Sequence, residues 1–122
     1  MIAVEGKARE PFGPLVSEWN DGSGKQERLD DLCLRLGLDA AGVGGLRYQL
    51  LHRTVSALLE ARRYGAREAL MLVHSFDAKN TSLDAYQAFA AALELGNAVA
   101  NAITGPTVRG EVTLRLGWVR DC

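Results

Sequence analysis

Apolar residues recur along the chain at two different spacings, and these spacings predict where its helices and strands lie. Over 29–36 they recur every three or four residues and Gly37 follows, which is typical of a helix that ends at a glycine. A longer helical pattern runs from Tyr48 to a stop at Gly65. A third begins at a capping box formed by Thr81 and Asp84 and is weakened at Gly96. The apolar faces of these last two helices are predicted to comprise Tyr48, Leu51, Val55, Leu58 and Leu59, and Tyr86, Phe89, Leu93 and Val99, respectively.

Three other segments have the pattern of strands. Residues 2–4 are apolar and lie too close to Pro11 for a helix, and Glu5 and Lys7 stand at the far end of this strand. Residues 69–76 form a near-continuous apolar run, which predicts a strand in mid-sheet that is covered on both faces. Apolar residues alternate with others over 112–118, which predicts a strand with two unequal faces. The order of elements predicts an α/β or α+β fold with helices packed on a small mixed sheet.

Composition narrows the class of protein. The chain has 122 residues, of which 48% are hydrophobic and 24% charged, and this is typical of one globular domain spanning residues 1–122. Its formal net charge of -1 does not indicate nucleic acid as a partner, so a nucleic-acid role would need a local site. No apolar run approaches the roughly 20 residues of a membrane span, and we expect no membrane association. Cys33 and Cys122 form neither a disulfide framework nor a metal-binding motif, which favours a cytoplasmic protein.

Glu5 and Lys7 are the first candidates for chemistry. They lie two residues apart, so a strand carries both on one face. A carboxylate can bind Mg²⁺ through oxygen, and a neighbouring lysine can position a metal-bound water for attack on a phosphate. Taken alone, however, a Glu-x-Lys triplet is more often an ion pair that faces solvent at the end of a strand. The surrounding sequence is needed to choose between these interpretations.

A polar stripe follows the second predicted helix. Gln49, Arg53, Ser56 and Glu60 lie three or four residues apart along it. Such a stripe is usually the solvated face of an amphipathic helix. The functional alternative is a face turned toward the strand end that carries Glu5.

Two further positions have both a structural and a functional interpretation. His74 shares a strand face with Leu70 and Leu72, and it is either a hydrogen-bonded core histidine or a group that binds phosphate or orders Glu5. Glu18 and Trp19 belong to the loop before the first helix, where Trp19 covers the edge of the core or stacks on a base.

Longer stretches of the sequence resemble a known superfamily. They are VEGKAREPFGP, SEWN, GKQERL, LRYQLLHRTVSALLEARRYGA, MLVHSF and LGWVRD, and together they span nearly all of the chain. These stretches resemble a bacterial family within the PD-(D/E)XK nuclease-like superfamily, which has the restriction-endonuclease-like fold. The resemblance implies that fold and an ancestral function in metal-dependent phosphodiester hydrolysis.

The resemblance also implies roles for individual residues. Glu5 corresponds to the metal-binding acid of the (D/E)XK half-motif, Lys7 to its lysine and Gln49 to the glutamine on the following helix, which makes the three the candidate catalytic residues. The superfamily has a further metal-binding Asp on a preceding strand, whereas here only Met1 precedes Ile2. We therefore expect a core that lacks its first elements and binds Mg²⁺ or Mn²⁺ weakly. Candidates for supporting roles are Glu18, Arg53, Glu60 and His74.

Two functions are compatible with these residues and with the resemblance. One is a degenerate or truncated nuclease-like protein, and the other is a non-enzymatic binding or interaction protein on the same scaffold. Because the strand over 2–7 begins at the first residues of the chain, one of its sides is expected to carry unpaired N–H and C=O groups. Ile2 and Val4 would add apolar area there, so we also predict a homodimer held partly through this strand.

Overall fold

The computed structural model describes residues 2–7, 13–22, 24–75, 83–96 and 98–120, with the backbone alone for Ile2–Lys7, Ser75 and Arg120. The elements in chain order are β1 (Ile2–Lys7), α1 (Val16–Trp19), α2 (Gln26–Leu36), the 3-10 helix η1 (Ala40–Gly42), α3 (Tyr48–Arg63), β2 (Glu68–Ser75), α4 (Leu83–Ala92), β3 (Ala102–Arg109) and β4 (Val112–Arg120). The predicted α+β class is confirmed. Neither α1 nor β3 was predicted from the sequence.

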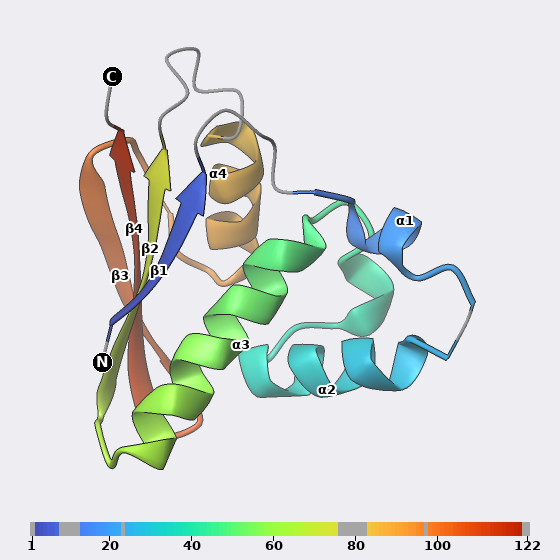
Figure 1. Cartoon of the computed structure of the whole chain (residues 1–122), viewed down its shortest axis with the longest axis horizontal. Coiled ribbons are helices and arrows are strands. Elements are labelled where there is room, and N and C mark those ends of the chain that lie inside the picture. The colour runs from blue at the N-terminus through green and yellow to red at the C-terminus, as the bar shows by residue number, and fades with distance from the viewer. Residues whose placement is uncertain (1, 8–12, 23, 76–82, 97, 121–122) are drawn as a thin grey trace.

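The four strands form one mixed sheet in the order β1-β2-β4-β3. β1, β2 and β4 run parallel, and β3 pairs antiparallel with β4. Figure 1 shows the described helices gathered on one side of this sheet. The predicted arrangement of helices on a small mixed sheet is therefore confirmed, and β1 lies at an edge of the sheet among the described strands.

Helix α2 forms where the apolar spacing predicted it. Leu29, Leu32, Cys33 and Leu36 are all buried, and they follow one another at the three- and four-residue spacing of one helix face. Gly37 ends the helix in the left-handed conformation with a φ of 71°, and its N–H reaches the carbonyls of Cys33 and Leu34. A glycine adopts this conformation without a steric penalty from Cβ, which explains why the helix stops there.

Helix α3 buries most of its predicted face and differs from the prediction at one leucine. Leu51, Val55 and Leu58 are buried, but Leu59 is 42% exposed and Leu50 is fully buried instead. Each residue turns the helix by about 100°, which places Leu59 just outside the buried face and Leu50 inside it. The buried face is therefore rotated toward Leu50 and Thr54 relative to the face that the sequence pattern predicted.

Helix α4 is shorter than predicted. Tyr86, Phe89 and Leu93 are buried as expected, whereas Val99 lies beyond the helix and is half exposed. The helix ends at Ala92 because the chain turns at Glu94, which has a positive φ of 64° and precedes the weak point at Gly96. The N–H of Leu95 then donates to the carbonyl of Ala90 and closes the final turn.

Strand β2 lies in mid-sheet as predicted, but its two faces differ. Ala69, Met71 and Val73 are buried against the helices, whereas Leu70 and Leu72 are only half-buried. The expectation that both faces are covered is therefore wrong for the part of the chain that the structure describes. Exposed apolar side chains continue this second face onto the neighbouring strands, at Ile103, Val108 and Val119. We call this surface the open sheet face.

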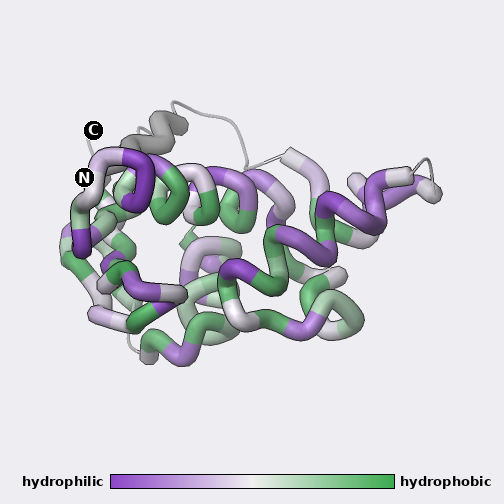
Figure 2. Tube along the Cα trace, turned by 90° about the horizontal axis from the view of Figure 1, so that it is seen from below, coloured by the Kyte–Doolittle hydropathy of each residue, from purple (hydrophilic) through white to green (hydrophobic). Residues whose placement is uncertain are grey.

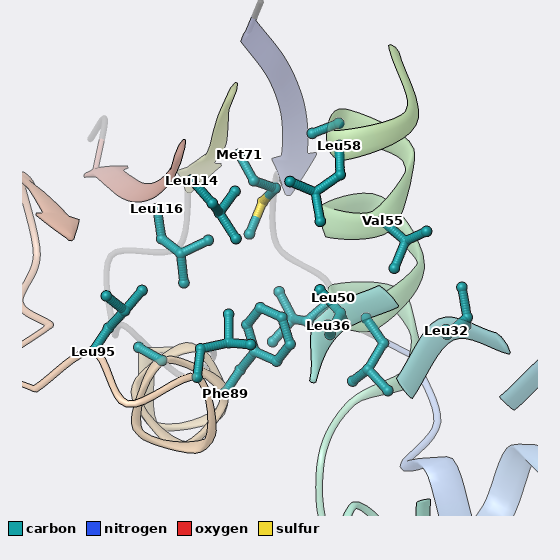
Figure 3. Close-up of a cluster of buried hydrophobic side chains, with 14 of the residues drawn as sticks. Leu32, Leu36, Leu50, Val55, Leu58, Met71, Phe89, Leu95, Leu114 and Leu116 are labelled. Carbon is teal, nitrogen blue, oxygen red and sulfur yellow. The ribbon is translucent and has the colours of Figure 1, made fainter. Parts of the chain in front are cut away.

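The core lies between the sheet and the helices. Figure 3 shows leucine, valine, methionine and phenylalanine side chains from α2, α3, α4, β2 and β4 pointing toward one another. Figure 2 shows the molecule from below, with hydrophilic and hydrophobic positions interleaved along the helices. Trp118 on β4 is fully buried, and its ring lies 5.2 Å from that of Tyr86, centroid to centroid. This single apolar layer fixes the sheet relative to α3 and thereby positions the residues at the ends of the parallel strands.

Candidate functional site

The carboxyl ends of the parallel strands β1, β2 and β4 lie at the same end of the sheet, and the start of α3 lies toward this end. β1 and β2 are parallel neighbours, and α3 packs against both of them. In Figure 1, α3 runs back along the sheet in the opposite direction, so that its first turn lies toward the end where β1 and β2 finish. In open α/β sheets, ligands bind at this end of the strands.

The register of β1 fixes the face on which Glu5 and Lys7 lie. Glu5 pairs with Val73 and Lys7 with Ser75, and paired residues of neighbouring parallel strands share one face of a sheet. Val73 is fully buried on the face that the helices cover. Both candidate residues are thus on the face toward α3, and their side chains lie outside what the structure describes.

Gln49 occupies the first turn of α3 and has an unsatisfied buried oxygen. Its Oε1 atom is inaccessible to solvent, and within the described part of the chain no hydrogen-bond donor reaches it. Its amide nitrogen lies against the loop after β1, since a Cβ on Gly13 would be 3.0 Å from it. A buried acceptor without a donor costs about 1–3 kcal/mol, so such an atom calls for an explanation, such as an ordered water, an ion or a functional role.

Hydrogen bonds to backbone carbonyls hold residues 13–15 against the first turn of α3. Arg47 Nη1 donates to the carbonyl of Gly13 at 2.8 Å, and the N–H of Tyr48 donates to the carbonyl of Pro14 at 3.1 Å. An isolated bridge pairs Leu15 with Arg47. Residues 13–15, which follow β1 in the sequence, are therefore tied directly to the turn that carries Gln49.

An aromatic stack lies beside Gln49. The sequence predicted that Trp19 covers the edge of the core, but it did not predict that Trp19 stacks on Tyr48. The rings of Trp19 and Tyr48 are stacked with centroids 3.9 Å apart, and His52 extends the stack from Tyr48 at 5.8 Å. Lys25 Nζ lies 5.4 Å from the centroid of Trp19. Trp19 packs at the edge of the core, in agreement with the structural interpretation of its role. The spacing of Tyr48 and His52, four residues apart on a helix, was the available signal.

The supporting acids lie in different places. Glu18 is exposed, and its Oε1 accepts a hydrogen bond from the N–H of Leu15 at 2.9 Å, so its carboxylate caps the start of α1. Glu60 lies 3.9 Å from Arg63 and is eleven residues beyond Gln49, about 16 Å along the helix axis at 1.5 Å per residue. Neither carboxylate is therefore gathered at the first turn of α3.

The two remaining supporting candidates also lie apart. Arg53 is exposed one turn after Gln49 on α3 and is the member of the polar stripe nearest to it. His74 pairs in register with Gly6 and Val119, which puts it on the open sheet face, opposite the face of Glu5 and Lys7. It is half-buried there. The register thus brings Glu5, Lys7 and the α3 layer together and separates His74 from them.

The described residues provide no cluster of three or more His, Cys, Asp or Glu side chains that could hold a metal ion. Among these residues, none of the helices combines the length and the apolar composition that a membrane-spanning helix requires.

Comparisons with known proteins give one match. Residues 1–122 match a protein family described as a domain of unknown function (DUF6946). No curated protein matches the chain, and no solved structure does.

Proposed function

The chain belongs to the family of domains of unknown function DUF6946, and we propose that it has a nuclease-like site for phosphodiesters at the carboxyl ends of β1 and β2. In this proposal Glu5 is the metal ligand, Lys7 positions the attacking water and Gln49 supports the reacting groups. The proposed site is degenerate, because Glu5 is the one metal-binding carboxylate assigned to it and an efficient site uses more than one. The other candidate residues contribute less, since Glu18 caps α1 and Glu60 lies far along α3.

The observation that carries this proposal is the buried, unsatisfied Oε1 of Gln49. It lies in the turn of α3 that contacts the loop after β1, and α3 covers the sheet face of Glu5 and Lys7. A purely structural glutamine at this position would be expected to satisfy its oxygen within the protein. A metal-bound water or a ligand hydroxyl would supply the missing donor.

A divalent metal fits these residues as a weakly bound group. Glu5 would offer a carboxylate, a ligand type that Mg²⁺ and Mn²⁺ accept, and Gln49 Oε1 would accept a hydrogen bond from a metal-bound water. The described residues contain no cluster that would complete a tight site. A bound metal would polarise a phosphate and make water a stronger nucleophile at neutral pH. Lys7 would hold that water near the phosphate, and the covering α3 would limit access of bulk solvent.

The test compares cleavage and binding of labelled single-stranded and duplex oligonucleotides at millimolar Mn²⁺ or Mg²⁺. We expect metal-dependent binding with slow cleavage, and we expect both to be reduced in Glu5→Gln, Lys7→Ala and Gln49→Ala. Glu27→Gln is the matched control, because Glu27 is exposed on α2. Gln49→Ala should lose function without losing stability, since its oxygen makes no hydrogen bond in the described protein. Oligonucleotide binding that is the same in Glu5→Gln and Glu27→Gln would refute the proposal.

A second candidate function, a non-enzymatic interaction protein, is favoured by the open sheet face. A hollow of about 460 Å³ there is lined by Leu70, Leu72, Asn101, Ala102, Ile103, Trp118 and Val119. Three of these side chains close over Gly117, where an added Cβ would lie 2.8 Å from Leu72 Cδ1 and 3.5 Å from Ile103 Cγ1. The result is a shallow apolar surface that water contacts unfavourably.

We propose that a second copy of the chain covers this surface and that the dimer continues along the edge of β1. Light scattering should give a dimer mass at tens of micromolar protein, as a rough working range for a moderate interface. Ile103→Ser should shift the mass toward the monomer, because Ile103 is 62% exposed on the open sheet face. Leu34→Ser, at a leucine that is 81% exposed away from this face, is the matched control. A monomer mass for the unmodified chain, unchanged on dilution, would refute the dimer.

The cellular compartment also belongs with the proposals. Cys33 is a free, buried thiol, as is common in proteins of a reducing compartment, and this supports a cytoplasmic location. Nucleic acid as a partner would rest on the local site alone, since the net charge of the chain is -1. The oligonucleotide experiment above tests that partner directly.

A further inference from the structure

A groove lies at the other end of α3, between α2, α3 and the turn that joins β3 to β4. Its volume is about 320 Å³. The residues that line it are Asp31, Leu34, Arg35, Leu58, Leu59, Arg62, Arg109 and Gly110. Figure 1 shows the end of α2 lying beside α3, with the lower end of the sheet close to the last turns of α3. Gln49 is in the first turn of α3, so this groove is separate from the candidate site.

Two exposed leucines, Leu34 and Leu59, give the groove an apolar surface. Leu34 on α2 is 81% exposed, and Leu59 on α3 is 42% exposed. Each belongs to an amphipathic helix whose main apolar face is already buried against the core. These two leucines therefore extend the apolar surface beyond what the described chain covers.

The charges around these leucines are predominantly positive. The lining contains three arginines and one aspartate, a local charge of +2 in a chain whose net charge is -1. Arg35 is already paired with Asp31, at 3.0 Å. Arg62 and Arg109 have no carboxylate partner among the residues that the structure describes. The positive potential is thus available to a ligand.

Arg109 is held so that its charge remains at the groove. Its Nη2 donates to the carbonyl of Leu93 at 2.8 Å, while its Nε is buried and finds no acceptor in the described part of the protein. Arg62 lies against the turn between β3 and β4, since a Cβ on Gly110 would be 3.9 Å from its Nη1. The guanidinium of Arg109 is therefore held by a backbone carbonyl, and that of Arg62 lies close to the turn beside the exposed leucines. A fixed arginine loses less side-chain freedom on binding a carboxylate than a mobile one does.

From this juxtaposition we propose that the groove binds a short acidic amphipathic helix of a partner protein. Leucine-type side chains of the partner would pack on Leu34 and Leu59, and its carboxylates would pair with Arg62 and Arg109. Helix-in-groove binding uses apolar anchors at i, i+3, i+4 and i+7, which match a groove formed by two helices. A carboxylate is a better match than a phosphodiester chain here, because the groove presents apolar area together with its cations.

The probe is a fluorescein-labelled helical peptide with leucines at i, i+3, i+4 and i+7 and glutamates at the other positions. Anisotropy should give a Kd in the range of tens of micromolar, as an order of magnitude for a small groove. A second peptide with lysines in place of the glutamates should bind at least about tenfold more weakly. In heteronuclear NMR spectra, the backbone signals of Leu34, Leu59, Arg62 and Gly110 should shift on titration with the acidic peptide.

Matched variants test the two halves of the proposal. Arg62→Glu should weaken binding by roughly tenfold or more, whereas Arg28→Glu, at an exposed arginine of α2 outside the groove, should leave it unchanged. Leu59→Ala should weaken binding, and Val108→Ala, which removes exposed apolar area elsewhere, should not.

Three outcomes would overturn the proposal. One is equal affinity of Arg62→Glu and Arg28→Glu for the acidic peptide. Another is equal affinity of the unmodified chain for the acidic and the lysine peptide. The third is an oligonucleotide that competes with the acidic peptide and loses affinity in Arg62→Glu, since the groove would then be a nucleic-acid site. These readouts are independent of Glu5 and Gln49, so they separate this proposal from the nuclease-like one.

Discussion

Two neighbouring leucines of α3 provide a direct test of how the helix packs. Leu58 is 4% exposed and Leu59 is 42% exposed, and both belong to the same turn of α3. Replacing each in turn by alanine removes the same three carbons from the same helix. The two variants therefore differ in burial and hardly at all in helix propensity or chemistry.

The expected cost follows from the environment of each side chain. Removing the buried carbons of Leu58 loses about 2–2.5 kcal/mol of transfer free energy, and a residual cavity adds to it, within an overall range of about 2–5 kcal/mol. Leu58 also lines the groove of about 320 Å³, so the cavity can open toward solvent and relax. We expect Leu58→Ala to cost about 2–3 kcal/mol. Leu59→Ala should cost less than about 1 kcal/mol, because a large part of its side chain is already in water.

Urea denaturation followed by circular dichroism measures both values. The slope of free energy against urea concentration should stay the same, so that the midpoint reports stability alone. Arg53→Ala, on the exposed polar stripe, should cost well under half of the Leu58→Ala penalty. If Leu58→Ala and Leu59→Ala agree within about 0.5 kcal/mol, the assignment of the buried face is wrong.

Three further predictions concern the metal, a thiol and a helix end. Calorimetry should find Mg²⁺ binding in the millimolar range or weaker, because Glu5 is its only proposed carboxylate ligand, and tight micromolar binding that Glu5→Gln abolishes would contradict this. Burial first, and then the charges of Asp30 and Asp39, raise the pKa of the Cys33 thiol above its ordinary value of 9.0. In a Cys122→Ser background, Cys33 should therefore resist iodoacetamide until the protein unfolds, and rapid labelling of the native protein would argue against this burial. The contribution of the protonated Cys33 thiol to stability is complete below pH 9.0, the unfolded value, and is lost as the pH rises through the higher pKa of the folded state. Gly37→Ala should lower stability by about 1 kcal/mol because Gly37 has a φ of 71°, and an unchanged urea midpoint would show that the end of α2 adapts without strain.

The parts of the fold that could be predicted are those in which one face is buried continuously. The spacing of Leu29, Leu32 and Leu36 identified α2, and the alternation along 112–118 identified β4. Strand β3 was missed because its sequence does not alternate cleanly and contains Gly105 and Pro106. A proline without an N–H is tolerated at a sheet edge, which is where β3 lies, and edge strands bury too little to leave a hydrophobic pattern.

Sequence spacing also predicted the wrong environment at two places for related reasons. The apolar run of β2 is typical of a strand covered twice, yet Leu70 and Leu72 remain half-buried in the described protein. The pattern records hydrophobicity and does not specify which molecule covers each face. The same holds for Leu59, which the pattern placed on the buried face of α3. A leucine at the border of a helix face can be either buried in the core or exposed on the surface, and Leu59 is exposed.

For the candidate site, the sequence located the strand and helix positions but not their relation. It placed Glu5 and Lys7 on one face, and the sheet register shows that this is the face α3 covers. It did not reveal that the carboxylate of Glu18 is used to cap α1, because a capping carboxylate and a free one look alike in sequence. The unsatisfied oxygen of Gln49 depends on packing between segments 34 or more residues apart, which no local spacing encodes.

The two tryptophans lie in different environments, so their intrinsic fluorescence reports on two different parts of the molecule. Trp118 is fully buried beside Tyr86, whereas Trp19 is partly accessible and stacks on Tyr48, the residue before Gln49. Emission from Trp118 should be blue-shifted and protected from acrylamide, while emission from Trp19 should be quenched both by acrylamide and by its stacking partner. In Trp19→Phe, fluorescence would follow global unfolding alone, and in Trp118→Phe it would follow events at the first turn of α3. A ligand could thus be detected at one end of the molecule, without a label, while the integrity of the core is recorded separately.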